Sequence, residues 1–256
     1  FFLSRYYEKK VMILLDEYDT PMQEAYVNGY WDELVSFTRS MFNAAFKTNF
    51  CLERAIMTGI TRVSKESIFS DLNNLEVVTT TSEKYADCFG FREEEVFAVL
   101  DEYGLSEKRQ EVKTWYDGFT FGKQKDIYNP WSILNYLDKR QIGTYWANSS
   151  SNSLAGKLIR EGSRNVKENF EVLLRGKSII VEIDEQIVYD QLSEDETEIW
   201  SLLLAGGYLK LINFNTFMTD IGEWKREYEL GMTNFEVRVM FRHMIRKWFG
   251  HGAGGY

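Results

Sequence analysis

The sequence is poor in cysteine, histidine and proline, with two of each among 256 residues. The two cysteines, Cys51 and Cys88, and the two histidines lie in unrelated sequence contexts. Two scattered thiols exclude a disulfide framework, and cysteines without histidine neighbours exclude a zinc site. We therefore expect reduced, buried thiols in a cytoplasmic protein.

The sequence also lacks a basic surplus and a long apolar run. It has 30 Lys and Arg against 39 Asp and Glu, a formal net charge of -9. A free-standing nucleic-acid-binding protein usually carries a basic surplus, because phosphate neutralisation supplies most of the affinity. Purely apolar runs are no longer than Val11–Leu15, far short of the ~20 residues that cross a bilayer. We expect no membrane contact, and nucleic-acid binding only through a local patch.

What is present is an ordinary globular composition, 44% hydrophobic, 27% charged and 16% aromatic. The first half alternates strands and helices. Five apolar residues, Val11–Leu15, predict a strand buried on both faces, as in a parallel sheet. Helical spacing predicts a helix over Asp32–Lys47, and two further strands are expected over Arg54–Ile60 and Glu76–Thr81. This order indicates an α/β fold.

The pattern then becomes mainly helical. We expect a helix over Arg92–Tyr103, a small hairpin that turns at Asp117-Gly118, and a helix that begins at Asn129-Pro130. After further helices, Glu196–Ala205 predicts a helix followed by two strands, an order typical of a winged-helix unit. The expected domains are residues 1–147, 148–232 and 233–256.

Two acids follow the first predicted strand. Asp16 and Glu17 complete the Walker B pattern of an apolar strand that ends in Asp-Glu. In this interpretation Asp16 holds Mg²⁺ and Glu17 polarises the attacking water. Ligands bind at the carboxyl ends of parallel strands, so the position is suitable. A solvated surface turn explains the same pattern, and Asp19 adds a third possibility, a two-metal nuclease or phosphatase site.

Polar residues also lie at the end of the predicted Arg54–Ile60 strand and just after it. If that strand lies beside the first, Thr58 is placed to sense the γ-phosphate of a nucleotide. Arg62 or Lys65 is then placed to contact phosphate charge. The alternative is a turn capped by Thr and Ser, with the two cations in solvent.

A phosphate-binding loop is missing. Such a loop needs Gly-x-x-x-x-Gly-Lys-Ser/Thr between a strand and a helix. Arg175–Ser178 carries the final triplet, but Glu171 stands in the place of the first Gly, and the segment runs from a helix into a strand. Only about ten residues precede the Walker B strand, too few for a strand, loop and helix. We therefore expect a fragment whose phosphate loop lay upstream, with both ends cut.

The last predicted helix, residues 234–249, carries two stripes. One is apolar, and the other consists of Arg238, Arg242 and Arg246 at a spacing of four residues. A basic stripe is usually the solvated face of an amphipathic helix. The alternative is a basic face for nucleic acid or for the acids of a partner.

The sequence resembles the bacterial AAA-ATPase-like family from Val11 to about Phe249. In that family a P-loop ATPase domain is fused to a C-terminal PD-(D/E)XK nuclease-like domain. The segments that carry the resemblance are Leu14–Pro21, Thr58–Ser70, Leu72–Leu75, Phe89–Phe91, Trp115–Phe119 and Tyr128–Ile133.

The resemblance implies an incomplete P-loop NTPase core with a parallel sheet, followed by a helical, winged-helix-like α+β region. It implies Walker B roles for Asp16 and Glu17 and a sensor-like role for Thr58–Arg62. The intact protein would bind and hydrolyse ATP-Mg²⁺ as a conformational switch, with a nuclease-like domain and a nucleic-acid or protein client as partners. Without the loop, we expect weak or absent nucleotide binding by this chain. A non-catalytic interaction module and a metal-dependent nuclease that uses Asp16, Glu17 and Asp19 are the alternatives.

Overall fold

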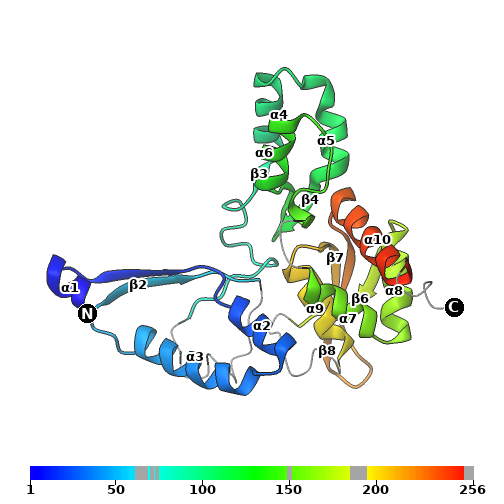
Figure 1. Cartoon of the computed structure of the whole chain (residues 1–256). Coiled ribbons are helices and arrows are strands. Elements are labelled where there is room, and N and C mark those ends of the chain that lie inside the picture. The colour runs from blue at the N-terminus through cyan, green and yellow to red at the C-terminus, as the bar shows by residue number, and fades with distance from the viewer. Residues whose placement is uncertain (61–68, 70–71, 73–74, 149–151, 185–194, 251–256) are drawn as a thin grey trace. The chain divides into compact units, whose positions relative to one another are not determined.

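The computed structural model describes residues 1–60, 69, 72, 75–148, 152–184 and 195–250 (Figure 1). The chain divides into two compact units. In the described residues, unit 1 comprises residues 1–77 and Asp184, and unit 2 comprises residues 78–183 and 195–250. Residues 78–147, which the sequence groups with the parallel strands, lie in unit 2. No described helix combines the length with the apolar character that crossing a bilayer demands.

Unit 1 is built on two parallel strands. Met12 of the first strand is opposite Arg54 of the second, and Leu14 is opposite Ile56. The expected order of strand, helix and strand is confirmed. The elements are α1 (Phe2–Tyr7), β1 (Val11–Leu15), α2 (Thr20–Asn28), α3 (Trp31–Phe46) and β2 (Leu52–Met57), drawn in blue in Figure 1.

Aromatic rings form the core of unit 1. The ring of Phe42, on α3, lies 5.8 Å from that of Phe69 in a stacked arrangement. Tyr18 meets Phe69 edge-on at 5.5 Å and Phe42 at 6.4 Å. The chain just after β1 is thereby held against α3.

The prediction that β1 is buried on both faces is wrong. Leu14 is 75% exposed and Met12 is 66% exposed, and Ile56 beside them on β2 is 61% exposed. Alternate side chains of a strand point to opposite faces, and only the face of Ile13 and Leu15 is half-buried. One face of this small sheet therefore presents apolar side chains to solvent.

The strand predicted over Glu76–Thr81 is also absent, since residues 75–79 have no regular structure and a turn follows at Thr80. The backbone N–H of Thr79 donates to Ser82 Oγ at 3.0 Å. The N–H of Ser82 in turn donates to the carbonyl oxygen of Thr79 at 3.0 Å. Local side-chain bonds of this kind compete with strand pairing, and here they replace it.

The first part of unit 2 packs helices around a three-stranded antiparallel sheet of order β3-β5-β4. Its core contains Val96, Leu100, Val112, Tyr116 and Ile133, all fully buried. The elements are β3 (Phe91–Arg92), α4 (Glu93–Glu102), a 3₁₀ turn (Ser106–Lys108), α5 (Arg109–Tyr116), β4 (Asp117–Phe121), β5 (Gln124–Tyr128), α6 (Pro130–Lys139) and a 3₁₀ turn (Trp146–Asn148).

The predicted hairpin exists, but its turn is not at Asp117-Gly118. Asp117 pairs with Tyr128, and the strands come together at Phe121 and Gln124, so the turn falls at residues 122–123. Gly118 is a strand residue. Its lack of a side chain is used for packing, because a Cβ there would collide with the backbone of Thr233.

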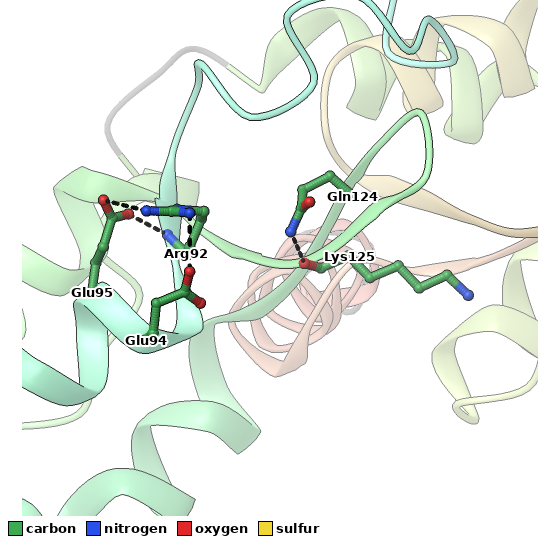
Figure 2. A network of polar contacts seen from close by, with 5 residues as sticks. All are labelled: Arg92, Glu94, Glu95, Gln124 and Lys125. Atoms are coloured by element: carbon green, nitrogen blue, oxygen red, sulfur yellow. Dashed lines mark hydrogen bonds and ion pairs between the residues drawn. The ribbon is translucent and has the colours of Figure 1, made fainter.

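The start of α4 is fixed by an exposed polar network (Figure 2). The Glu95 carboxylate accepts a hydrogen bond of 2.8 Å from the backbone N–H of Arg92. The Arg92 guanidinium pairs with Glu94 at 3.1 Å and with Glu95 at 3.4 Å. The same view shows Gln124 Nε2 donating to the carbonyl oxygen of Lys125. The first bond satisfies a free N–H at the helix start, whereas exposed ion pairs contribute little.

The second part of unit 2 has a three-stranded antiparallel sheet of order β6-β8-β7. The register places Ile179 opposite Leu230, and Lys210 opposite Gly231. The predicted helix and two-stranded ribbon are confirmed as elements. They correspond to α9, β7 and β8. The elements of this part are α7 (Ser153–Glu161), α8 (Arg164–Leu174), β6 (Ile179–Val181), α9 (Glu196–Ala205), β7 (Leu209–Met218), β8 (Trp224–Met232) and α10 (Phe235–Gly250).

The start of α10 is built into the core of unit 2. The Glu236 carboxylate, fully buried, accepts hydrogen bonds from Ser132 Oγ at 2.8 Å and from the N–H of Ala147 at 3.2 Å. Burial raises the pKa of Glu236, and these donors oppose the shift. Asn234 Nδ2 donates to the carbonyl oxygen of Tyr116 at 3.2 Å. Residues 233–250 therefore pack with the elements that precede them.

Candidate functional site at two parallel strand ends

The candidate site lies where β1 and β2 end. The strands are parallel, so their carboxyl ends meet at the same edge of the sheet. The N–H of Thr58 donates to the carbonyl oxygen of Leu15 at 2.9 Å, and the N–H of Tyr18 donates to the carbonyl oxygen of Thr58 at 3.0 Å. These bonds extend the pairing beyond the strands and hold the two following loops together.

Asp16 is oriented by two donors. Its Oδ1 accepts a hydrogen bond from Thr58 Oγ1, across 42 residues of sequence, and one of 3.0 Å from the N–H of Glu17. In the described part of the chain, Oδ2 has no protein partner. The residue is exposed. Asp16 therefore presents a fixed carboxylate with one oxygen free for a ligand.

Glu17 has a left-handed backbone, with φ of 51°. This conformation costs an L-residue about 1 kcal/mol. The N–H of Thr20 donates to the carbonyl oxygen of Glu17 at 3.1 Å, which closes a turn into α2. The Glu17 side chain is exposed and has no partner among the residues described. Strained residues often occur at functional sites, and this one leaves a free carboxylate beside Asp16.

Asp19 differs from this pair in being buried and hydrogen-bonded through both carboxylate oxygens. It is 1% exposed, and its Oδ1 accepts a hydrogen bond from the N–H of Ile60 at 3.3 Å. Its Oδ2 accepts from Gln23 Nε2 at 3.1 Å. A Cβ at Gly59 would lie 2.4 Å from Asp19 Oδ1, so a larger residue at that position would displace the Asp19 carboxylate. Asp19 thus joins the loops after the two strands.

The structure brings Asp16, Glu17 and Thr58 together and leaves Asp19 as a buried link. Within the described ranges, no three His, Cys, Asp or Glu side chains form a group that could hold a metal. The predicted phosphate-contacting residues Arg62 and Lys65 lie outside those ranges. Sequence analysis did not identify the role of Gly59, although a glycine close to a strand end is a signal of close approach.

The donor chemistry fits Mg²⁺. The free oxygen belongs to an exposed carboxylate, and the neighbouring side chain is a hydroxyl. Mg²⁺ prefers oxygen ligands, retains several waters, and is usually held by one or two carboxylates together with substrate phosphates. Asp16 would hold the ion here, and Thr58 would orient the Asp16 carboxylate. A phosphate-binding loop would have to complete the site.

Comparison with protein families gives a match in unit 1. A family model described as "Predicted AAA-ATPase" matches residues 2–69. The matched stretch contains all five candidate residues, Asp16, Glu17, Thr58, Arg62 and Lys65. The chain is therefore similar to predicted AAA-ATPases over its N-terminal part.

A curated relative is similar over most of the chain. It is the "Uncharacterized protein in vnfD 5'region" of Azotobacter chroococcum mcd 1, 28% identical over 238 residues. The alignment covers 93% of this chain and 43% of the relative, so the chain spans less than half the length of that protein. No solved structure matches.

Proposed function

We propose that the protein binds ATP with Mg²⁺ and hydrolyses it to switch conformation. The observation that carries this proposal is the hydrogen bond from Thr58 to Asp16, which joins the carboxyl ends of two neighbouring parallel strands. A polar residue placed this way beside a strand-end acid is the arrangement that P-loop ATPases use. The match to predicted AAA-ATPases over residues 2–69 supports the same class.

Each residue has a distinct proposed role. The free oxygen of Asp16 holds Mg²⁺, directly or through water, and Thr58 keeps that carboxylate in place. The exposed carboxylate of Glu17 accepts the proton of the attacking water. Arg62 or Lys65 contacts phosphate charge. When bound, Mg²⁺ neutralises charge that develops on the phosphate oxygens.

The phosphate loop itself is proposed to lie in sequence outside these 256 residues. Supporting this, the exposed face of Met12, Leu14 and Ile56 is the kind of apolar surface that further strands and helices cover in an α/β sheet. The match to less than half of a longer relative is consistent with additional sequence. By itself, the chain should bind ATP weakly or not at all.

We infer that unit 2 transmits the switch. The sheet order β6-β8-β7, with α9 before the β7–β8 ribbon, supports a winged-helix-like arrangement. The intact protein would act on a nuclease-like domain, with a nucleic-acid or protein client.

The test uses the intact gene product that contains this chain. Wild type should hydrolyse ATP in the presence of Mg²⁺, and Glu17→Gln should lower kcat about 100-fold while ATP binding persists. Asp16→Asn should weaken Mg²⁺-dependent binding. Glu33→Gln, which removes an acid from the first turn of α3, is the matched control and should retain activity. Hydrolysis that survives Glu17→Gln would remove the assigned base.

A second candidate is an interaction module without turnover. The exposed apolar face of unit 1 favours it, since large exposed patches mark association sites. It predicts no hydrolysis by the intact protein and partner binding that is indifferent to Glu17→Gln. The nuclease alternative receives no support, because Asp19 is buried and both of its carboxylate oxygens accept hydrogen bonds within the protein.

A further inference from the structure

Gly176–Ser178, the end of the segment that was excluded as a phosphate loop by its order along the chain, form one wall of a basic pocket in unit 2. The pocket has a volume of about 620 Å³. The residues that define its chemistry are Gly176, Lys177, Ser178, Lys210, Gly231 and Arg238.

The sheet register assembles this pocket from distant parts of the sequence. Lys210 of β7 lies opposite Gly231 of β8. The chain enters β6 through Lys177 and Ser178, on the other side of β8. The first turns of α10 bring Arg238 to the same place. Three cations therefore converge from three elements of one compact unit.

These cations lack close ion pairs in the described structure, although Asp117 interacts electrostatically with Lys210. None of Lys177, Lys210 and Arg238 forms an ion pair with a described Asp or Glu. The Nε of Arg238 is buried and lacks a hydrogen-bond partner. Burial, together with the nearby charge of Arg242, lowers the pKa of Arg238. The guanidinium lies over the Phe235 ring, 5.8 Å from its centroid, which offsets part of the cost of burying a cation beside other cations. A bound anion would offset more of that cost.

Glycine brings the guanidinium close to the backbone. Gly176 has φ of +81°, and a Cβ there would lie 3.0 Å from Nη1 of Arg238. Without the Cβ, Arg238 packs directly beside the turn that carries Lys177. The pocket is thus shaped by the turn as well as by its charges.

Two acids lie nearby and do not cancel the positive charge. Glu229 accepts a hydrogen bond of 2.6 Å from Ser178 Oγ and is held on that hydroxyl. Asp117 interacts electrostatically with Lys210 and also with Lys113. The three cations remain a local surplus in a chain whose net charge is -9.

We propose that this pocket binds the phosphate group of a small molecule. Three separate cations suit an oxyanion that offers several oxygens, whereas a carboxylate is satisfied by one bidentate arginine. Arg238 lines the pocket with a charged side chain, and the volume is that of a small-molecule site. All residues that line the pocket belong to unit 2, and none of them belongs to the proposed ATP site.

Pyrophosphate is the probe for this proposal, titrated into the 256-residue chain by isothermal calorimetry. Lys210→Gln and Arg238→Gln should each weaken binding at least about tenfold, because each removes a charged hydrogen-bond donor. Lys177→Gln, at an exposed side chain whose loss cannot unfold the unit, should weaken binding as well. Arg175→Gln is the matched control: it is adjacent to the pocket, but Arg175 pairs with Glu171 at 2.5 Å. It should retain wild-type affinity.

Three results would overturn the proposal. Unchanged affinity in both Lys177→Gln and Lys210→Gln would show that pyrophosphate does not enter this pocket. Equal affinity for malonate would remove the preference for phosphate. Tight binding of a single-stranded oligonucleotide, without binding of pyrophosphate, would assign the surface to a nucleic-acid backbone instead.

Discussion

Gly118 and Thr233 are in closer contact than any side chain at position 118 would permit. A Cβ at Gly118 would lie 1.8 Å from the carbonyl oxygen of Thr233. Thr233 is itself fixed, since its Oγ1 donates to the carbonyl oxygen of Gly207 at 2.7 Å. The segment that leads into α10 therefore lies directly against β4.

Gly118→Ala should destabilise unit 2 by about 3 kcal/mol, because backbone must move on one side of the contact. The φ of +141° at this glycine adds strain for any L-residue. Urea unfolding followed by tryptophan fluorescence measures the loss. Gly104→Ala is the control, because its φ of +69° is also unfavourable but no atom lies within 4 Å of the added Cβ. It should cost about 1 kcal/mol. If both variants lose the same free energy of unfolding, the contact with Thr233 does not restrict the side chain at position 118.

The raised pKa of Asp117 predicts that the stability of unit 2 depends on pH. Burial, with repulsion from Asp126, raises the pKa of Asp117 from 3.8 to about 6, although Lys113 and Lys210 oppose the shift. The folded state thus binds the proton more tightly than the unfolded state. This contribution to stability is present below pH 3.8 and is lost as the pH rises through about 6.

Asp117→Asn stays neutral, so its stability relative to wild type should rise between about pH 4 and 7. The gain should be on the order of 1 kcal/mol once solvent screening is allowed for. Urea midpoints at pH 4.5 and 7.5, values chosen on either side of about pH 6, give the measurement. Asp126→Asn removes the repulsion and should move the change to lower pH. If the urea midpoints of wild type and Asp117→Asn change equally with pH, Asp117 does not cause the pH dependence.

Substitutions at Thr58 test whether its hydrogen bond to Asp16 supports the proposed ATP hydrolysis. Thr58→Val keeps the shape of the side chain but removes the hydroxyl, so Asp16 loses one of its two donors. In the intact protein we expect the Mg²⁺ requirement for ATP hydrolysis to rise and the rate to fall about tenfold. Thr58→Ser restores the donor and should restore the Mg²⁺ dependence. If Thr58→Val and Thr58→Ser show the same Mg²⁺ dependence, the hydroxyl of Thr58 does not position the Asp16 carboxylate.

Substitutions on the two faces of β1 test whether the apolar face of unit 1 is exposed to solvent. Leu14→Lys should change the free energy of unfolding by less than about 0.5 kcal/mol, because that side chain is 75% exposed. It should also reduce self-association of the chain, measured by light scattering, because it interrupts an apolar patch. Ile13→Lys, on the half-buried face of the same strand, is the control and should be destabilising. If both variants unfold equally, the face of Leu14 is covered in solution.

Local pattern was sufficient for much of unit 1. The apolar run Val11–Leu15 and the helical spacing of Asp32–Lys47 predicted elements that the structure contains, because the period of side-chain burial is set by local geometry. The position of Asp16 followed from the end of that run. The expected strand over Glu76–Thr81 failed because Ser82 bonds to the backbone of Thr79, and a propensity for strands does not reveal such competition.

The sequence by itself determined where the first strand ends, where the acids stand along the chain, and the basic stripe of the last helix. Tertiary structure alone decided which residues meet. Parallel pairing brought Thr58 to Asp16, and the order β6-β8-β7 brought Lys177 and Lys210 to Arg238. The physical reason is that sheet pairing joins residues tens of positions apart, and its register depends on packing over the whole unit, which no local period records.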